Sequence, residues 1–193
     1  MRIVETPVKD AYLIELEPKE DHRGAFCRLF CSEVLREYGI DDHRFVQVNL
    51  SDNSQEGTLR GMHYQAEPFL EAKILYCLQG SLYDVIIDLR KKSKTYLHYF
   101  GLKLSADNPC ALYIPRGFAH GFLTLEDDTR LLYLMSEFYK AGYEMGYRYD
   151  DPSFRIQWPC QPKIISDKDQ NFPPFVNNSP YAKRVEIGHG SRI

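Results

Sequence analysis

From about residue 44 to residue 138, short apolar runs alternate with turn-forming residues. Gly57, Gly80, Asp107-Asn108-Pro109 and Asp127-Asp128 mark several of the turns. The runs predict strands at residues 45–50, 58–64, 73–78, 82–89, 96–104, 111–114, 120–125 and 130–138. Short strands with a turn every ~8 to 12 residues are typical of sandwiches and jelly-roll barrels. We therefore predict a mainly β protein built as a jelly-roll barrel.

The sequence pattern on either side of this region is different. Residues 32–39 predict one short helix, because Ser32 can cap its start, Glu33 suits its positive end and Gly39 is a natural stop. Six of the eleven prolines follow residue 150, so this C-terminal segment should be irregular and pack over the barrel. Residues 1–193 are accordingly expected to form one domain.

Composition narrows the class of protein. A chain of 193 residues that is 44% hydrophobic can bury a sizeable core. Its formal net charge is only -3, so no overall field would recruit nucleic acid or a membrane surface. The five cysteines are odd in number and lack CxxC spacing, which favours buried, reduced thiols over disulfides or a zinc cluster. Without a long apolar stretch near the N-terminus, we expect a cytoplasmic protein.

Residues 57–65 hold the densest group of chemically useful side chains, including Arg60 and His63. A His beside an anion-binding Arg can act as a general base, although a single His is more often a hydrogen-bonded core residue. Strict alternation along a strand would send Arg60 and His63 to opposite faces. Either a bulge at Gly61 re-aims Arg60, or Arg60 lies at the mouth of the strand. Lys73 begins the next predicted strand, which would be adjacent in a meander.

Residues 114–122 place His120 after a Pro-x-Gly-x-x-His turn and resemble the second half of the cupin double motif, whose His residues bind a metal. Metal-binding cupins usually add His-x-His and a nearby Glu. Here the first motif reads His63-Tyr64-Gln65, and Gln is a poor replacement for imidazole, so we expect no metal. The His, Lys and Tyr side chains that remain can supply a base, an oxyanion-stabilising cation and a phenol acid. These are the groups needed to remove and return a proton beside a carbonyl.

Over most of its length the chain resembles the dTDP-4-dehydrorhamnose 3,5-epimerases, which are cupin-type nucleotide-sugar epimerases. The matching motifs are Asp21-His22-Arg23-Gly24, Gln47-Val48-Asn49-Leu50-Ser51, residues 59–65, Lys73, residues 84–90, Ser93, Thr95, residues 114–122, Tyr133, Tyr139, Glu144, Asp151-Pro152, Trp158-Pro159 and Ser166-Asp167-Lys168-Asp169. Their occurrence in the family order makes the resemblance specific.

The resemblance implies a cupin-like homodimer without a cofactor. It would epimerise a nucleotide-linked 4-keto-6-deoxyhexose in rhamnose-type deoxysugar biosynthesis. His63 would abstract the ring proton, with Asp169 orienting the imidazole. Lys73 would stabilise the enolate oxygen, and Tyr133 would return a proton from the opposite face. The implied substrate-binding residues are Arg23, Arg28, Gln47, Asn49, Arg60, His120, Tyr139 and Glu144.

Three departures from the family pattern fall where substrate identity could be set. The chain reads Phe26-Cys27-Arg28 where the family usually has a Glu after the Phe. Leu134 replaces a common Lys, and residues 147–150 replace Ile-x-Trp-Asn. A CDP- or GDP-linked sugar, or inversion of one carbon instead of two, therefore stays an alternative. A metal-dependent cupin enzyme and a non-catalytic sugar-nucleotide-binding protein are alternatives from other classes.

Overall fold

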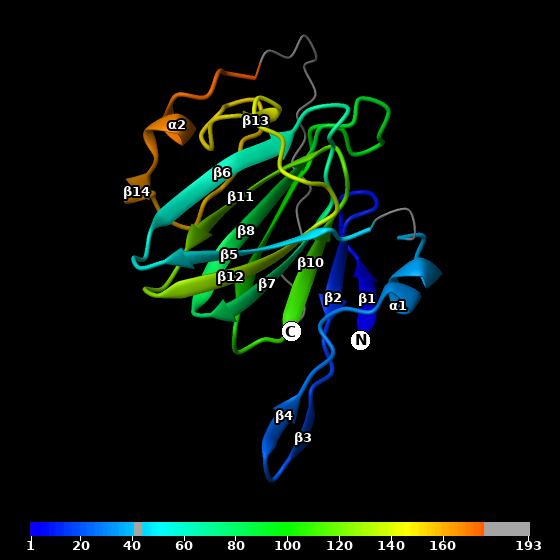
Figure 1. The fold of residues 1–193 in the computed structure, drawn as a ribbon. Helices are drawn as coiled ribbons and strands as arrows, with labels where there is room; N and C mark the ends of the chain where they lie inside the picture. Colours follow the sequence, from blue (N-terminus) through cyan, green and yellow to red (C-terminus); the bar gives the residue numbers. More distant parts are fainter. Residues whose placement is uncertain (41–43, 176–193) are drawn as a thin grey trace.

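Two antiparallel sheets packed against each other form the body of the molecule in the computed structural model (Figure 1), which describes residues 1–40 and 44–175. The tail from about residue 176, which the predicted domain includes, lies outside these residues. The first sheet has the order β1 (Arg2–Glu5), β2 (Tyr12–Glu15), β10 (Cys110–Ile114), β7 (Lys73–Gln79), β12 (Thr129–Met135) and β5 (Gln47–Asn53). The second has the order β13 (Glu144–Gly146), β6 (Thr58–Gln65), β11 (Phe118–Thr124), β8 (Ser81–Asp88) and β9 (Tyr99–Ser105).

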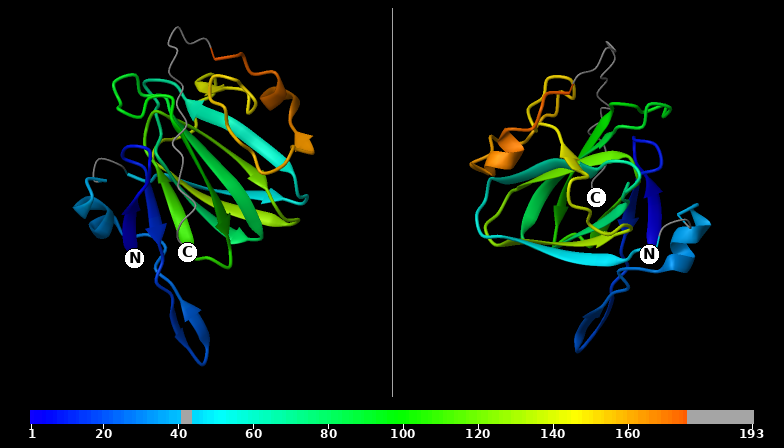
Figure 2. Two further views of the ribbon diagram at one scale, coloured as in Figure 1. Left: turned by 180° about the vertical axis from the view of Figure 1, so that it is seen from behind. Right: turned by 45° about the horizontal axis from the view of Figure 1, so that its top comes forward.

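Smaller elements surround the sheets. The short strand β14 (Ile164–Ile165) lies parallel to β6, and the helix α2 (Asp167–Gln170) follows it. The helix α1 (Ser32–Glu37) covers part of the first sheet. The hairpin of β3 (Lys19–Asp21) and β4 (Gly24–Phe26) projects away from the body (Figures 1 and 2). No helix among residues 1–40 and 44–175 is long and apolar enough to cross a membrane.

The apolar runs are explained by burial on both faces of the sheets. The central core lies between the sheets, where Leu75 and Leu131 of the first sheet meet Ile86 and Phe122 of the second. A second cluster covers the outer face of the first sheet beneath α1, and a third covers the outer face of the second sheet around Phe154. Strands buried on both faces read as continuous apolar segments instead of alternating ones.

The structure confirms the mainly β, cupin-like jelly-roll fold and the eight strands predicted from the sequence, with ends shifted by a few residues. It also confirms the helix, but the prediction that Ser32 caps it is wrong. The N-cap residue is Cys31, and no side chain caps the helix. The predicted adjacency of the strand beginning at Lys73 to the strand of His63 is also wrong, because β7 and β6 belong to different sheets. All five cysteines are free as predicted, although only Cys110 is buried.

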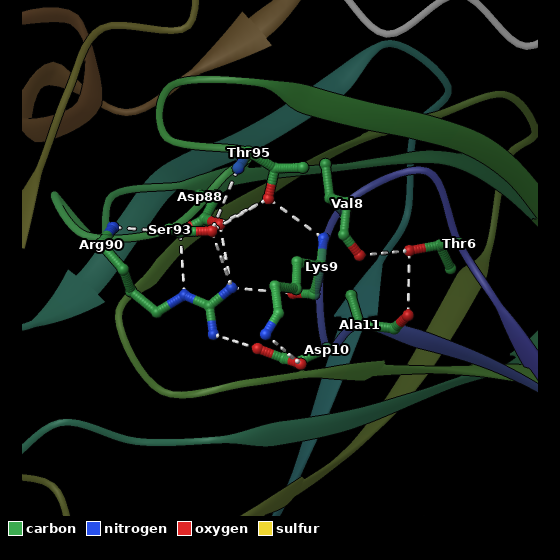
Figure 3. A network of polar contacts seen from close by, with 9 residues as sticks. All are labelled: Thr6, Val8, Lys9, Asp10, Ala11, Asp88, Arg90, Ser93 and Thr95. Carbon is green, nitrogen blue, oxygen red and sulfur yellow. Dashed lines mark hydrogen bonds and ion pairs between the residues drawn. The ribbon is translucent and has the colours of Figure 1, made fainter.

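A polar network joins the N-terminal turn to the connection between β8 and β9 (Figure 3). Asp88, which is 0% exposed, accepts hydrogen bonds from Arg90 at 2.9 Å and from the Thr95 hydroxyl at 2.7 Å. Arg90 also bonds Asp10 at 2.8 Å and the Lys9 carbonyl at 2.8 Å. The network therefore fixes two segments that are about 80 residues apart in the chain.

Candidate active site

A bulge in β6 aims two candidate residues at the same pocket. In the pairing of β6 with β11, His63 lies opposite His120 and Arg60 lies opposite Phe122, so β6 has one more residue than its partner between these pairs. Gly61 within the bulge has φ +122°, and a Cβ atom on it would lie 2.5 Å from the Cα of Gly121. The extra residue brings both Arg60 and His63 to the pocket between the sheets. Of the two alternatives for Arg60, the structure therefore shows the bulge at Gly61.

His63 is held by a buried carboxylate from the far end of the chain. Its Nε2 lies 2.8 Å from Oδ1 of Asp169, which is 3% exposed. The other oxygen of Asp169 accepts a hydrogen bond from the Gly61 amide at 2.9 Å. Burial would raise the pKa of Asp169, but the hydrogen bonds from His63 and Gly61 outweigh it and hold the pKa below its usual value. Asp169 is therefore an anion that orients His63 and leaves Nδ1 as the ring nitrogen able to accept a proton.

Lys73 and Tyr133 line the same pocket from the opposite sheet. The Lys73 ammonium is 2.6 Å from Oε1 of Glu71, and both side chains are less than 10% exposed. Burial and, second, the Asp84 carboxylate raise the pKa of Tyr133 far above that of an ordinary phenol. Tyr133 is therefore protonated at neutral pH and can act as an acid.

Several further polar side chains line the pocket. His120, which is 5% exposed, has its Nε2 2.9 Å from the buried Asp84 carboxylate. Gln47 and Asn49 of β5 bond each other at 3.0 Å. At the mouth, the Tyr139 hydroxyl and the Lys168 ammonium both bond the Glu144 carboxylate. The pocket thus contains ten of the predicted residues or their direct partners: His63, Asp169, Lys73, Tyr133, Gln47, Asn49, Arg60, His120, Tyr139 and Glu144.

Two predicted substrate-binding residues lie elsewhere. Arg23, on the projecting hairpin, pairs with Asp21 at 2.6 Å, and Arg28 follows that hairpin; neither lines the pocket of its own chain. Conversely, several residues that received no predicted role do line it, among them Glu71, Gln65 and Lys168. Position within the matching motifs was a signal for Gln65 and Lys168, whereas only the contacts of Glu71 with Lys73 and Gln65 link Glu71 to the site.

The charges in this pocket suit acid–base chemistry. Among residues 1–40 and 44–175, no group of three or more His, Cys, Asp or Glu side chains is placed to hold a metal ion. Instead, a carboxylate-oriented imidazole faces a protonated phenol and an ammonium group across a space between two sheets. A base, an acid and an oxyanion-stabilising cation in this arrangement can exchange a proton beside a carbonyl.

Comparison with known proteins gives one consistent family. The family model described as dTDP-4-dehydrorhamnose 3,5-epimerase matches residues 5–177. The chain is 40% identical over 177 residues to the dTDP-4-dehydrorhamnose 3,5-epimerase of Shigella flexneri, covering 92% of this chain and 97% of that protein.

Two solved structures are similar along most of the chain. The dTDP-4-dehydrorhamnose 3,5-epimerase of Bacillus anthracis, with TDP and PPi bound, has a TM-score of 0.86 and 41% identity, covering 90% of this chain and 99% of that one. The enzyme of Legionella pneumophila, in complex with dTDP-4-keto-L-rhamnose, has a TM-score of 0.82 and 34% identity, covering 87% of this chain and 89% of that one.

Proposed function

Because the chain belongs to the dTDP-4-dehydrorhamnose 3,5-epimerase family, we propose that its pocket binds a dTDP-linked 4-keto-6-deoxyhexose and inverts the carbons on either side of the keto group. The protein is an isomerase, a carbohydrate epimerase of dTDP-rhamnose biosynthesis. The observation that carries the proposal is the placement of His63 and Tyr133 on opposing sheets across one pocket.

In the proposed mechanism, His63 Nδ1 removes the proton from a carbon next to the keto group. The electron pair moves onto the keto oxygen, and the Lys73 ammonium stabilises the resulting enolate. Tyr133 then donates its phenolic proton to the same carbon from the opposite side of the ring, which inverts the centre. His63 now has one proton more and Tyr133 one fewer, so exchange with solvent must reset both groups before the next inversion.

The binding groups proposed for the nucleotide diphosphate line the same pocket. Arg60 and His120 supply positive charge or hydrogen-bond donors for the phosphates, and Gln47 and Asn49 supply polar contacts. Tyr139, which is 58% exposed, offers a ring face to the sugar or the base, while Glu144 fixes its hydroxyl. Relatives with TDP or a dTDP-sugar bound support dTDP over CDP and GDP as the carrier.

We further propose a cytoplasmic homodimer in which the hairpin β3–β4 of one protomer reaches the pocket of its partner. All six residues of the two hairpin strands are exposed, Phe26 at 78%. β5, at the edge of the first sheet, exposes Val48 at 61% and Leu50 at 60%. Such apolar surface is typical of an interface. In this dimer Arg23 and Arg28 would act in trans, and the free thiols support a reducing compartment.

Proton NMR of dTDP-4-keto-6-deoxyglucose in deuterated water tests the function. We expect loss of the H3 and H5 signals with the enzyme, together with formation of the inverted sugar. The CDP- and GDP-linked sugars, tested in parallel, should react at least ~tenfold more slowly. Loss of only one signal would reduce the assignment to a single-centre epimerase, and no exchange on any carrier would exclude it.

A further inference from the structure

Gln65, the last residue of β6, is 4% exposed, and its side chain takes part in four hydrogen bonds. Its Nε2 donates to Glu71 Oε2 at 2.8 Å and lies 3.2 Å from the Phe69 carbonyl and 3.3 Å from that of Phe138. Its Oε1 accepts from the Lys140 amide at 2.8 Å. These contacts use the full donor capacity of a carboxamide, and they lead to two separate walls of the pocket.

The first wall carries Lys73. One oxygen of Glu71 accepts from Gln65, and the other lies 2.6 Å from the Lys73 ammonium. Because the Glu71 and Lys73 side chains are nearly buried, few positions satisfy both of them. The orientation of Gln65 therefore sets that of Glu71, which in turn sets that of Lys73.

The second wall is a strap formed by residues 137–143, which carries Tyr139 to the pocket mouth. Phe138 and Tyr139 are 55% and 58% exposed, so apolar packing holds this part of the strap only weakly. Gln65 binds the backbone on both sides of Tyr139, through the Phe138 carbonyl and the Lys140 amide. The Gln65 carboxamide thus anchors the strap next to Tyr139, the residue that the strap carries to the pocket.

We propose that Gln65 is a positioning residue that holds both Lys73 and Tyr139 in place relative to His63. The kinetic consequences rest on the proposed function, since they require Lys73 to act in turnover and Tyr139 to act in binding. The anchoring itself does not depend on it.

Exchanging the side chains of Gln65 and Glu71 separates the effect on Lys73 from the effect on the strap. Gln65→Glu places two carboxylates in contact and removes the donor to the strap, so kcat should fall and KM should rise, each about tenfold. In the double variant Gln65→Glu/Glu71→Gln, the new amide can donate to Glu at 65 and accept from Lys73. We expect kcat to return to within about threefold of the wild type while KM stays raised. A double variant with kcat no better than that of Gln65→Glu would overturn the proposal.

Proteolysis tests the anchor without any turnover. In Gln65→Met the strap loses its donor and acceptor, and trypsin cleavage after the exposed Lys140, followed by mass spectrometry, should accelerate about tenfold or more. Gln79→Met, a change of the same kind at an exposed position of β7 outside the pocket, should cleave at the wild-type rate. Equal rates in Gln65→Met and the wild type would refute the inference. A wild-type protein that exchanges no substrate hydrogen would refute the proposed function alone.

Discussion

At the scale of single residues, His63 and Tyr133 are prepared for opposite tasks by their surroundings. The Asp169 carboxylate, 2.8 Å from Nε2 of His63, orients the ring so that Nδ1 is left to accept a proton. Burial and the nearby Asp84 carboxylate instead hold the proton on Tyr133, because they disfavour the phenolate. In the proposed mechanism, His63 is thus placed to take a proton, and Tyr133 retains its own until the strongly basic enolate carbon is present.

Replacing each residue should therefore affect different steps. His63→Asn should lower both solvent hydrogen exchange and inversion by two to four decades, the usual contribution of a general base. Tyr133→Phe should leave exchange at the first carbon within about tenfold of the wild type, but lower inversion by about a hundredfold or more. Deuterium incorporation and product formation, followed in the same NMR sample, measure the two steps. Equal losses of both in Tyr133→Phe would contradict its role as the acid.

At the scale of elements, the bulge in β6 decides whether Arg60 and His63 share a pocket. It depends on close contact with β11, where a side chain at position 61 would meet Gly121 and the His120 carbonyl. A regular strand would send Arg60 to the opposite face. The bulge is therefore both a packing feature and a requirement of the site.

Gly61→Ala should destabilise the fold by about 2–4 kcal/mol, because it combines a left-handed backbone with a backbone clash. Gly39→Ala is the matched control. Gly39 also has positive φ, +75°, but a Cβ atom added to it would have no neighbour within 4 Å, so its cost should be about 1 kcal/mol. Urea denaturation measures both costs. Similar values for the two variants would show that β6 tolerates a side chain in the bulge.

The network around Asp88 should make stability depend on acid pH. Burial would raise the pKa of Asp88, but hydrogen bonds from Arg90, Ser93 and Thr95 outweigh it and keep the pKa below its usual value. The stabilisation is therefore fully present above about pH 4, the range of an unfolded Asp, and is lost as pH falls through the lower folded value.

Asp88→Asn tests this contribution. We expect the free energy of unfolding to fall by about 2–4 kcal/mol at neutral pH, because Arg90 loses its buried partner. The variant should also show a smaller loss of stability than the wild type between about pH 4 and pH 2, measured by urea titration. An unchanged dependence on pH in this range would mean that other carboxylates control acid unfolding.

At the scale of the whole molecule, the position of Arg23 on a projecting hairpin makes the dimer testable by complementation. His63→Asn and Arg23→Ala should each be nearly inactive alone. If the hairpin acts in trans, a mixed dimer contains one pocket with an intact His63 and an intact Arg23. Joint refolding of equal amounts should then restore about a quarter of the wild-type activity, since half of the dimers are mixed and half of their sites are complete. No restoration, with each variant inactive alone, would contradict the action of the hairpin in trans, and a fully active Arg23→Ala would exclude Arg23 from the site.

The strands could be predicted from the sequence more completely than the contacts within the site. The strands between residues 44 and 138 were predictable, because apolar runs and turn residues act locally. The short strands β1 to β4, β13 and β14 were missed, since runs of two to four residues carry little pattern and depend on their partners. Family motifs indicated His63, Lys73, Tyr133 and Asp169 as the acid–base set and implied the contact of Asp169 with His63, but they did not indicate the contact of Lys73 with Glu71.

The sequence by itself determined a mainly β protein with a set of groups suited to proton transfer beside a carbonyl. Only the tertiary structure decided that β7 faces β6 from the other sheet and that a bulge turns Arg60 toward the pocket of His63. Glu71 and Gln65 gained their significance in the same way. Local sequence patterns specify conformation within a segment, whereas the meeting of distant side chains depends on sheet packing and chain closure over the whole molecule.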